Sequence, residues 1–166
     1  MKAVTIVGKG SGYEECCLDS STGDIWATST AFKPLSDVGI LADKVFQLHG
    51  PELFEPWLKD IQDRLVLMSP VIGFEKATVL PAEKLIKCFG ERFGGSVSWM
   101  IAYAIVEGYE EIRFRGIHLS HFSEYGNQRD SFFYCIGRAE ALGIKIVTDP
   151  FSGISFPNQT YGRSSL

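Results

Sequence analysis

Strand-like and helix-like segments alternate along this chain of 166 residues, and the alternation constrains its fold more than any other feature. The strand-like runs are short, rich in β-branched or aromatic residues, and bounded by turn residues. They span residues 4–7, 24–28, 44–48, 64–68, 78–80, 111–116 and 144–147, and helical patterns lie between them at 52–63, 81–89, 96–107 and 127–142. Such alternation builds βαβ units, so we predict an α/β fold with one mostly parallel sheet and helices on both of its faces.

The length of the chain is enough for one domain with its own buried core. We expect residues 1–148 to form this domain. Residues 149–166 are rich in Ser, Gly, Pro and Asn, and we expect them to form an irregular tail that packs on the same domain.

The charge and the apolar pattern restrict the partners. The net charge of −4 argues against non-specific nucleic-acid binding, because such binding needs a basic surface that displaces counterions. No run of 18 or more apolar residues is present, so we expect no membrane span. The first strand begins near residue 3, and the four cysteines lack metal-ligand spacing. We therefore expect a cytoplasmic protein with reduced thiols, with no signal peptide and no metal site.

The loop after the first strand reads "VGKGSGYEE" and has the layout of a phosphate-binding turn. Gly8 and Gly10 fit the first two glycines of a dinucleotide fingerprint, but Tyr13 occupies the place of the third, and no acidic residue follows the second strand. The loop also lacks the Gly-Lys-Ser/Thr of a P-loop. Two interpretations remain: a generic anion site made by free backbone N–H groups, or a tight turn alone.

A second glycine-rich turn, "FGGSVSWMIAYAIVEG", precedes an almost wholly apolar helix that must be buried on nearly all sides. Ser96 is a good N-cap for this helix, and Ser96 and Ser98 lie at its positive end, where a ligand oxygen would be stabilised. The alternative is that Ser96 serves only as the cap.

Ligands of open parallel sheets bind beyond the carboxyl ends of the strands, and polar residues follow several strands of this chain. The residues expected to contact a ligand at this edge are Gly8, Gly10, Ser11, Ser29, His49, Ser96, Ser98, His118, Asn127 and Arg129. Arg129 is included because it stands near the positive end of a helix and could meet a phosphate. The same clustering would also arise if these residues were polar merely because loops are polar.

Four motifs occur in the order "VGKGS", "VFQLHG", "GGSVSWMIAYAIVEGYEEI" and "EYGNQRDSFFYCIGRAEALGIKI". Together they resemble a family of small, mostly phage-encoded Rossmann-like proteins over nearly the whole chain. More distantly, the chain is similar to bacterial sialyltransferases that use a CMP-sugar and to archaeal pterin pyrophosphokinase-like domains. The resemblance to the transferases implies that Gly8, Gly10, Ser11, Ser96 and Ser98 line a nucleotide pocket.

The sialyltransferases carry a general-base histidine just before their last long helix. Glu124 stands near that position in this chain, with His118 and His121 a few residues upstream. These three residues are the catalytic candidates. The missing histidine and the shorter chain depart from the sugar-transfer pattern.

We therefore expect a protein that binds a nucleotide or a nucleotide derivative, with no further cofactor. For a phage protein, one use would be to sequester a host immune signalling nucleotide. The alternative is a small transferase or hydrolase that acts on an activated nucleotide such as a nucleotide-sugar. A third class, a protein-interaction module, would need an exposed apolar stripe, and the apolar residues of 127–142 can equally face the sheet. The sequence is compatible with a homo-oligomer.

Overall fold

The computed structural model describes residues 1–10, 23–119, 128–148 and 154. The predictions for Ser11, His121, Glu124 and Asn127 lie outside the described residues, as does the predicted tail apart from residue 154. Within these ranges, seven strands form one sheet. They are β1 (Ala3–Val7), β2 (Asp24–Thr28), β3 (Lys44–Gln47), β4 (Leu65–Leu67), β5 (Thr78–Val79), β6 (Glu111–Arg115) and β7 (Lys145–Val147).

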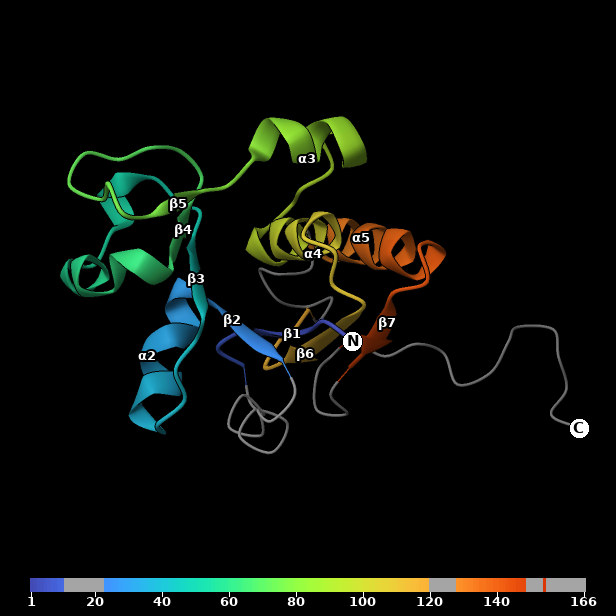
Figure 1. The fold of residues 1–166 in the computed structure, drawn as a ribbon, viewed down its shortest axis with the longest axis horizontal. Helices are drawn as coiled ribbons and strands as arrows, with labels where there is room; N and C mark the ends of the chain where they lie inside the picture. Colours follow the sequence, from blue (N-terminus) through green and yellow to red (C-terminus); the bar gives the residue numbers. More distant parts are fainter. Residues whose placement is uncertain (11–22, 120–127, 149–153, 155–166) are drawn as a thin grey trace, which may run out of the picture.

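The spatial order of the strands is β5-β4-β3-β2-β1-β6-β7, and all neighbouring strands are parallel (Figure 1). The α/β class, the parallel sheet and the positions of all seven strands are thus confirmed. The chain winds outward from β1 to β5 and then returns to place β6 on the other side of β1. The strand order reverses between β1 and β6, which is where open α/β sheets bind their ligands.

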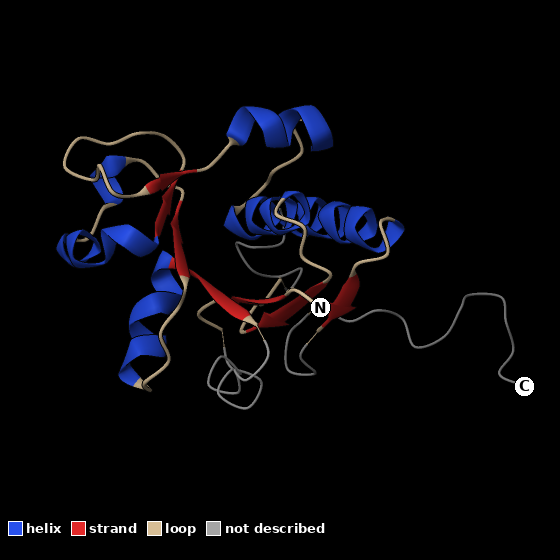
Figure 2. Cartoon of the chain, in the orientation of Figure 1, coloured by secondary structure: helices blue, strands red, loops and turns tan. Residues whose placement is uncertain are grey.

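Helices cover both faces of the sheet (Figure 2). On one face lie α3 (Ala82–Phe89), α4 (Ser96–Val106) and α5 (Arg129–Ala141), and their buried residues share one hydrophobic core. On the other face, α2 (Ser29–Asp37) and the 3₁₀-helix η4 (Pro56–Arg64) contribute to a second core. The expected burial of α4 is also found, because five consecutive residues, 100–104, are buried.

The alternation of side chains along each strand separates the two cores. On β2, Trp26 joins the core under α4 and α5, while its neighbours Ile25 and Ala27 join the core under α2. On β3, Phe46 and Val45 divide in the same way. The centres of β2 and β3 therefore carry consecutive apolar residues, which is typical of a sheet that is buried on both faces.

Two helical segments differ from the sequence prediction. The pattern at 52–63 forms two short 3₁₀-helices, η3 (Pro51–Leu53) and η4, rather than one α-helix. Pro56 lies inside the predicted helix and lacks the N–H that a continuous helix would need, so the second helix starts there instead. The other difference is α2, which was not predicted. None of the described helices has both the length and the hydrophobicity that crossing a bilayer requires.

Candidate functional site

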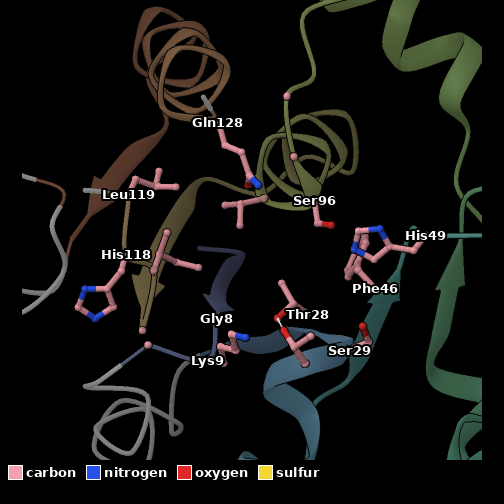
Figure 3. Close-up of a pocket in the computed structure, with 17 residues that line it drawn as sticks. Gly8, Lys9, Thr28, Ser29, Phe46, His49, Ser96, His118, Leu119 and Gln128 are labelled. Carbon is pink, nitrogen blue, oxygen red and sulfur yellow. Dashed lines mark hydrogen bonds between the residues drawn. The ribbon is translucent and has the colours of Figure 1, made fainter. Parts of the chain in front are cut away.

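A cavity of about 640 Å³ opens at the carboxyl ends of β1, β2, β3 and β6 (Figure 3). Its volume is within the usual range for small-molecule sites. Its walls come from the turns after these strands, from the first residues of α2 and α4, and from the N-cap of α5. The lining residues are Gly8, Lys9, Gly10, Thr28, Ser29, Thr30, Phe46, His49, Gly94, Gly95, Ser96, Val97, Gly116, Ile117, His118, Leu119 and Gln128.

Gly8 and Gly10 bring the end of β1 against the segment that follows β6. The backbone N–H of Gly8 donates to the carbonyl of Arg115 at 3.0 Å, and that of Gly10 donates to the carbonyl of Gly116 at 2.8 Å. The expectation that these loop amides are free for an anion is therefore wrong for Gly8 and Gly10. A Cβ on Gly8 would lie 2.6 Å from the carbonyl oxygen of Gly116, so this close approach requires glycine.

The start of α4 forms the opposite wall. Gly95 is the N-cap and Ser96 is the first helical residue, so the prediction of Ser96 as the cap is wrong by one position. The first backbone N–H groups of an α-helix have no acceptor within the helix, and here they begin beside the cavity. Ser98 does not reach the cavity, because it is buried and its hydroxyl donates to the carbonyl of Gly95 at 2.6 Å.

The start of α2 forms the third wall. Thr28 is its N-cap, and no side chain caps the helix. The hydroxyls of Thr28 and Thr30 are 3.1 Å apart. The hydroxyl of Ser29 donates to Oε1 of Gln47 at 2.6 Å. The amino-terminal ends of α2 and α4 thus face one cavity, and both carry the positive end of a helix dipole.

The charge of the lining favours an anion. Among the residues that line the cavity in the described part of the chain, none is Asp or Glu, although the protein contains 20 of them. Lys9 lies between the end of β1 and Thr28, and the exposed His49 faces the cavity from the turn after β3 (Figure 3). Apolar surface comes from Phe46 and from the side chains of Val97, Ile117 and Leu119.

The structure brings six of the predicted contact residues to this cavity. They are Gly8, Gly10, Ser29, His49, Ser96 and His118. The imidazole of His118 points away from the centre of the cavity, and a Cβ on Gly10 would contact it (Figure 3). Arg129 lies outside the lining. Its guanidinium donates to the carbonyl of Leu119 at 3.0 Å and stands over the ring of Phe133.

Eleven of the seventeen lining residues were not among the predicted contacts, and three of these are Lys9, Phe46 and Gln128. Lys9 stands inside the glycine loop, and its position alone could have indicated it. Phe46 reads as a core residue of β3 and gives no separate signal, since its ring is almost fully buried. Gln128 precedes α5 and points into the cavity (Figure 3), close enough that a Cβ on Gly95 would meet its side chain. Only the tertiary structure shows this contact.

Two described groups with clearly shifted pKa values, Tyr109 and Glu111, lie at the other, amino-terminal edge of the sheet. Burial raises the pKa of Tyr109, and its hydrogen bond to Asp24 adds to the rise. Burial opposes ionisation of Glu111 at the start of β6, but hydrogen bonds from Arg113 and Lys145 outweigh it and lower the pKa of Glu111. In the described part of the chain, no group of three or more His, Cys, Asp or Glu residues is placed to hold a metal ion.

No protein-family model and no curated protein matches the chain. Thiamine pyrophosphokinase from Bacillus subtilis is similar in structure, with a TM-score of 0.50 at 13% sequence identity, over 89% of this chain and 60% of that chain. This chain therefore spans less than two thirds of the pyrophosphokinase. The sialyltransferase CstII from Campylobacter jejuni, in complex with the substrate analogue CMP-3FNeuAc, gives a TM-score of 0.49 at 18% identity, over 89% of this chain and 80% of that chain. At these identities the likeness concerns the fold alone, and the fold that the chain shares with the pyrophosphokinase is the α/β arrangement that its sequence predicts.

Proposed function

We propose that the cavity at the carboxyl edge of the sheet binds a nucleotide or a nucleotide-derived small molecule. One observation carries this proposal: the amino-terminal ends of α2 and α4 meet Lys9 at one cavity, and no carboxylate belongs to its described lining. Helix amino termini and a lysine stabilise phosphate oxygens. The absence of acidic side chains from this lining removes the repulsion that an anionic ligand would otherwise meet.

The remaining surface suits the rest of a nucleotide. Val97 is partly exposed and supplies apolar surface for a flat ring, and the hydroxyls of Thr28 and Ser29 supply hydrogen-bonding groups for polar atoms. The position at the reversal of strand order supports the same interpretation, because ligands of open α/β sheets bind there.

We propose binding without turnover as the main activity. The described catalytic candidate, His118, turns its imidazole away from the cavity, which supports this choice (Figure 3). Sequestration of a host signalling nucleotide, which the sequence resemblance leads us to expect, is the use that fits such an activity. We propose this sequestration as the biological role of the binding.

The direct test is to denature the purified protein and identify the released small molecules by mass spectrometry. A parallel thermal-shift panel of nucleotides would find ligands that purification removes. We expect a nucleotide that is released unchanged, or a clear rise in melting temperature for some members of the panel. No released nucleotide and no shift for any member would overturn the proposal.

A transfer or hydrolysis reaction on the same ligand is the second candidate function. His49 favours it, because its exposed imidazole lines the cavity and histidine is the commonest acid or base in enzymes. The test is to incubate the protein with nucleotide-sugars and separate the products by chromatography. If His49 is the acid or base, His49→Gln will abolish product formation and preserve binding. A complete lack of products with the unmodified protein would reject this function.

A further inference from the structure

Gln47, at the end of β3, is a polar residue enclosed by the protein, with only 3% of its surface exposed. Both ends of its amide are used. Its Nε2 donates to the carbonyl of Leu53 at 3.2 Å, and its Oε1 accepts the hydrogen bond from the hydroxyl of Ser29 at 2.6 Å. Gln47 thereby links the first residue of α2 to the segment that follows His49.

This pair of hydrogen bonds has a fixed direction. A backbone carbonyl can only accept, so the group that faces Leu53 must be the amide nitrogen of Gln47. The reversed amide would place two acceptors against each other inside the protein, at the cost of an unsatisfied buried group. The oxygen of Gln47 therefore faces Ser29. The hydroxyl of Ser29 has a single hydrogen, and that hydrogen is committed to Gln47.

Ser29 consequently presents only lone pairs to the cavity that it lines. An ionised phosphate oxygen has no hydrogen to share and gains nothing from the Ser29 hydroxyl. This hydroxyl thus differs from the first backbone N–H groups of α2 and α4, which are donors.

We infer that Ser29, held by Gln47, selects ligands that carry a hydrogen-bond donor where they meet its hydroxyl. This inference rests on the proposed nucleotide-binding function. It specifies the ligand as a nucleotide whose ribose hydroxyl or base amino group donates to Ser29 Oγ. Gln47 is a positioning residue, since it acts through Ser29 and does not itself line the cavity.

The test measures dissociation constants by calorimetry for ribonucleoside monophosphates, for their 2′,3′-dideoxy counterparts, and for pairs that differ in a base amino group, such as CMP and UMP. Removing the one donor that meets Ser29 should weaken binding about tenfold, the usual scale for one hydrogen bond. The comparison of ribonucleotides with dideoxynucleotides (the sugar arm) tests the ribose hydroxyls, and the comparison of CMP with UMP (the base arm) tests the base amino group. Together they show which group supplies the donor. In Ser29→Ala the donor should no longer matter, because its acceptor is gone.

Gln47→Met tests whether Gln47 fixes the direction of the Ser29 hydrogen bond or only supports the local structure. With no acceptor at position 47, the hydroxyl of Ser29 can rotate and donate as well as accept. The preference for the donor-bearing ligand should then fall from about tenfold to about twofold, while affinity for inorganic phosphate should not fall. A structural role would weaken every ligand alike. Ser36→Ala, an exposed hydroxyl near the far end of α2, is the matched control and should leave all constants unchanged.

The outcomes separate this inference from the function on which it rests. If nucleotides bind but neither the sugar arm nor the base arm changes the affinity, the inference is wrong and nucleotide binding stands. An equal loss for all ligands in Gln47→Met would also contradict it. If the unmodified protein binds no nucleotide, the proposed function fails, and the role of Ser29 fails with it.

Discussion

Gly10 sets how closely the end of β1 approaches the segment after β6. A Cβ at this position would lie 2.7 Å from the carbonyl oxygen of Gly116 and would also contact the ring of His118. The carbonyl belongs to the backbone and cannot move aside as a flexible side chain could. The shape of the cavity at the reversal of strand order therefore depends on a residue that has no side chain.

Gly10→Ala is expected to lower the free energy of unfolding by about 2 kcal/mol, as overpacking at a tight contact usually does. Gly137→Ala is the matched control. In the described part of the chain, no atom outside the backbone of α5 itself lies within 4 Å of a Cβ at Gly137, so alanine there should stabilise the protein by about 0.5 kcal/mol through its higher helix propensity. Urea unfolding of both variants checks the pair. If Gly10→Ala and Gly137→Ala changed the free energy of unfolding equally, the contact with Gly116 would not destabilise the Gly10→Ala variant.

Lys9 is the lysine of the described lining, and its side chain is exposed. Lys9→Met should weaken binding of a phosphate-bearing ligand by about threefold to tenfold, since an exposed charge contributes about 1 kcal/mol. The difference in affinity between Lys9→Met and the unmodified protein should shrink in 1 M salt, where exposed charges are screened within a few ångströms. Calorimetry at low and high salt measures this. Lys87→Met, an exposed lysine on α3 outside the lining, should have no effect at either salt concentration.

At the scale of elements, β6 carries different chemistry at its two ends. Its carboxyl end leads into the cavity, while Glu111 at its amino end is 2% exposed and paired with Arg113 at 2.5 Å and Lys145 at 3.1 Å. Lys145 lies on β7, so this cluster links neighbouring strands. It lies at the sheet edge away from the cavity, and we expect it to affect stability but not binding.

Glu111→Gln is expected to cost about 2 kcal/mol of stability near neutral pH, because Glu111 is buried and the amide would replace two charge-assisted hydrogen bonds, from Arg113 and Lys145, with weaker ones. The pKa of Glu111 is lower in the folded state than in the unfolded state. Its contribution is therefore fully present above the unfolded pKa and is lost as pH falls through the folded value. The difference in the free energy of unfolding between the two proteins should be constant from about pH 6 to 8 and should narrow as the pH falls below the ordinary glutamate pKa of about 4.3. Unfolding curves across this range would contradict the assignment if the gap stayed open in acid.

The elements also show how far the sequence predicts the fold. All seven strands could be located, because apolar β-branched runs bounded by turns have few other interpretations. The helix α2 could not, since its N-cap and first two residues are all hydroxyl residues and it contains Pro34, a pattern that favours a loop. Its amphipathic face, with Ala31, Phe32 and Leu35 buried, becomes evident only when the sheet is present.

The candidate site was predictable where it follows strand ends and unpredictable where it depends on packing. His49 and Ser29 were found because ligands of parallel sheets bind at those ends. The interpretation that the loop offers free amides does not hold at Gly8 and Gly10. The pairing of β1 with the β6 segment continues past the end of the strand and uses those N–H groups. The spacing of residues in the sequence does not indicate such pairing, because it joins segments that are far apart in the chain.

At the scale of the whole molecule, the net charge of −4 contrasts with the lining of the cavity, in whose described part no carboxylate is found. A ligand that binds only the folded chain stabilises it by mass action. At a concentration one hundred times the dissociation constant, the gain is about 2.7 kcal/mol, and the melting temperature should rise in proportion to the logarithm of the ligand concentration. Scanning calorimetry over a dilution series measures this. A melting temperature independent of concentration would show that the ligand does not bind the native state.

Trp26 gives the folded chain a built-in optical reporter. Its ring lies 5.2 Å from that of Phe46, which is both a core residue and part of the cavity wall, and in the described structure its indole N–H is buried without a hydrogen-bond partner. The emission of such an indole is sensitive to the polarity and packing of its immediate surroundings. In a variant with Trp57→Phe and Trp99→Phe, where Trp26 is the remaining tryptophan, filling the cavity should change the fluorescence without any added label.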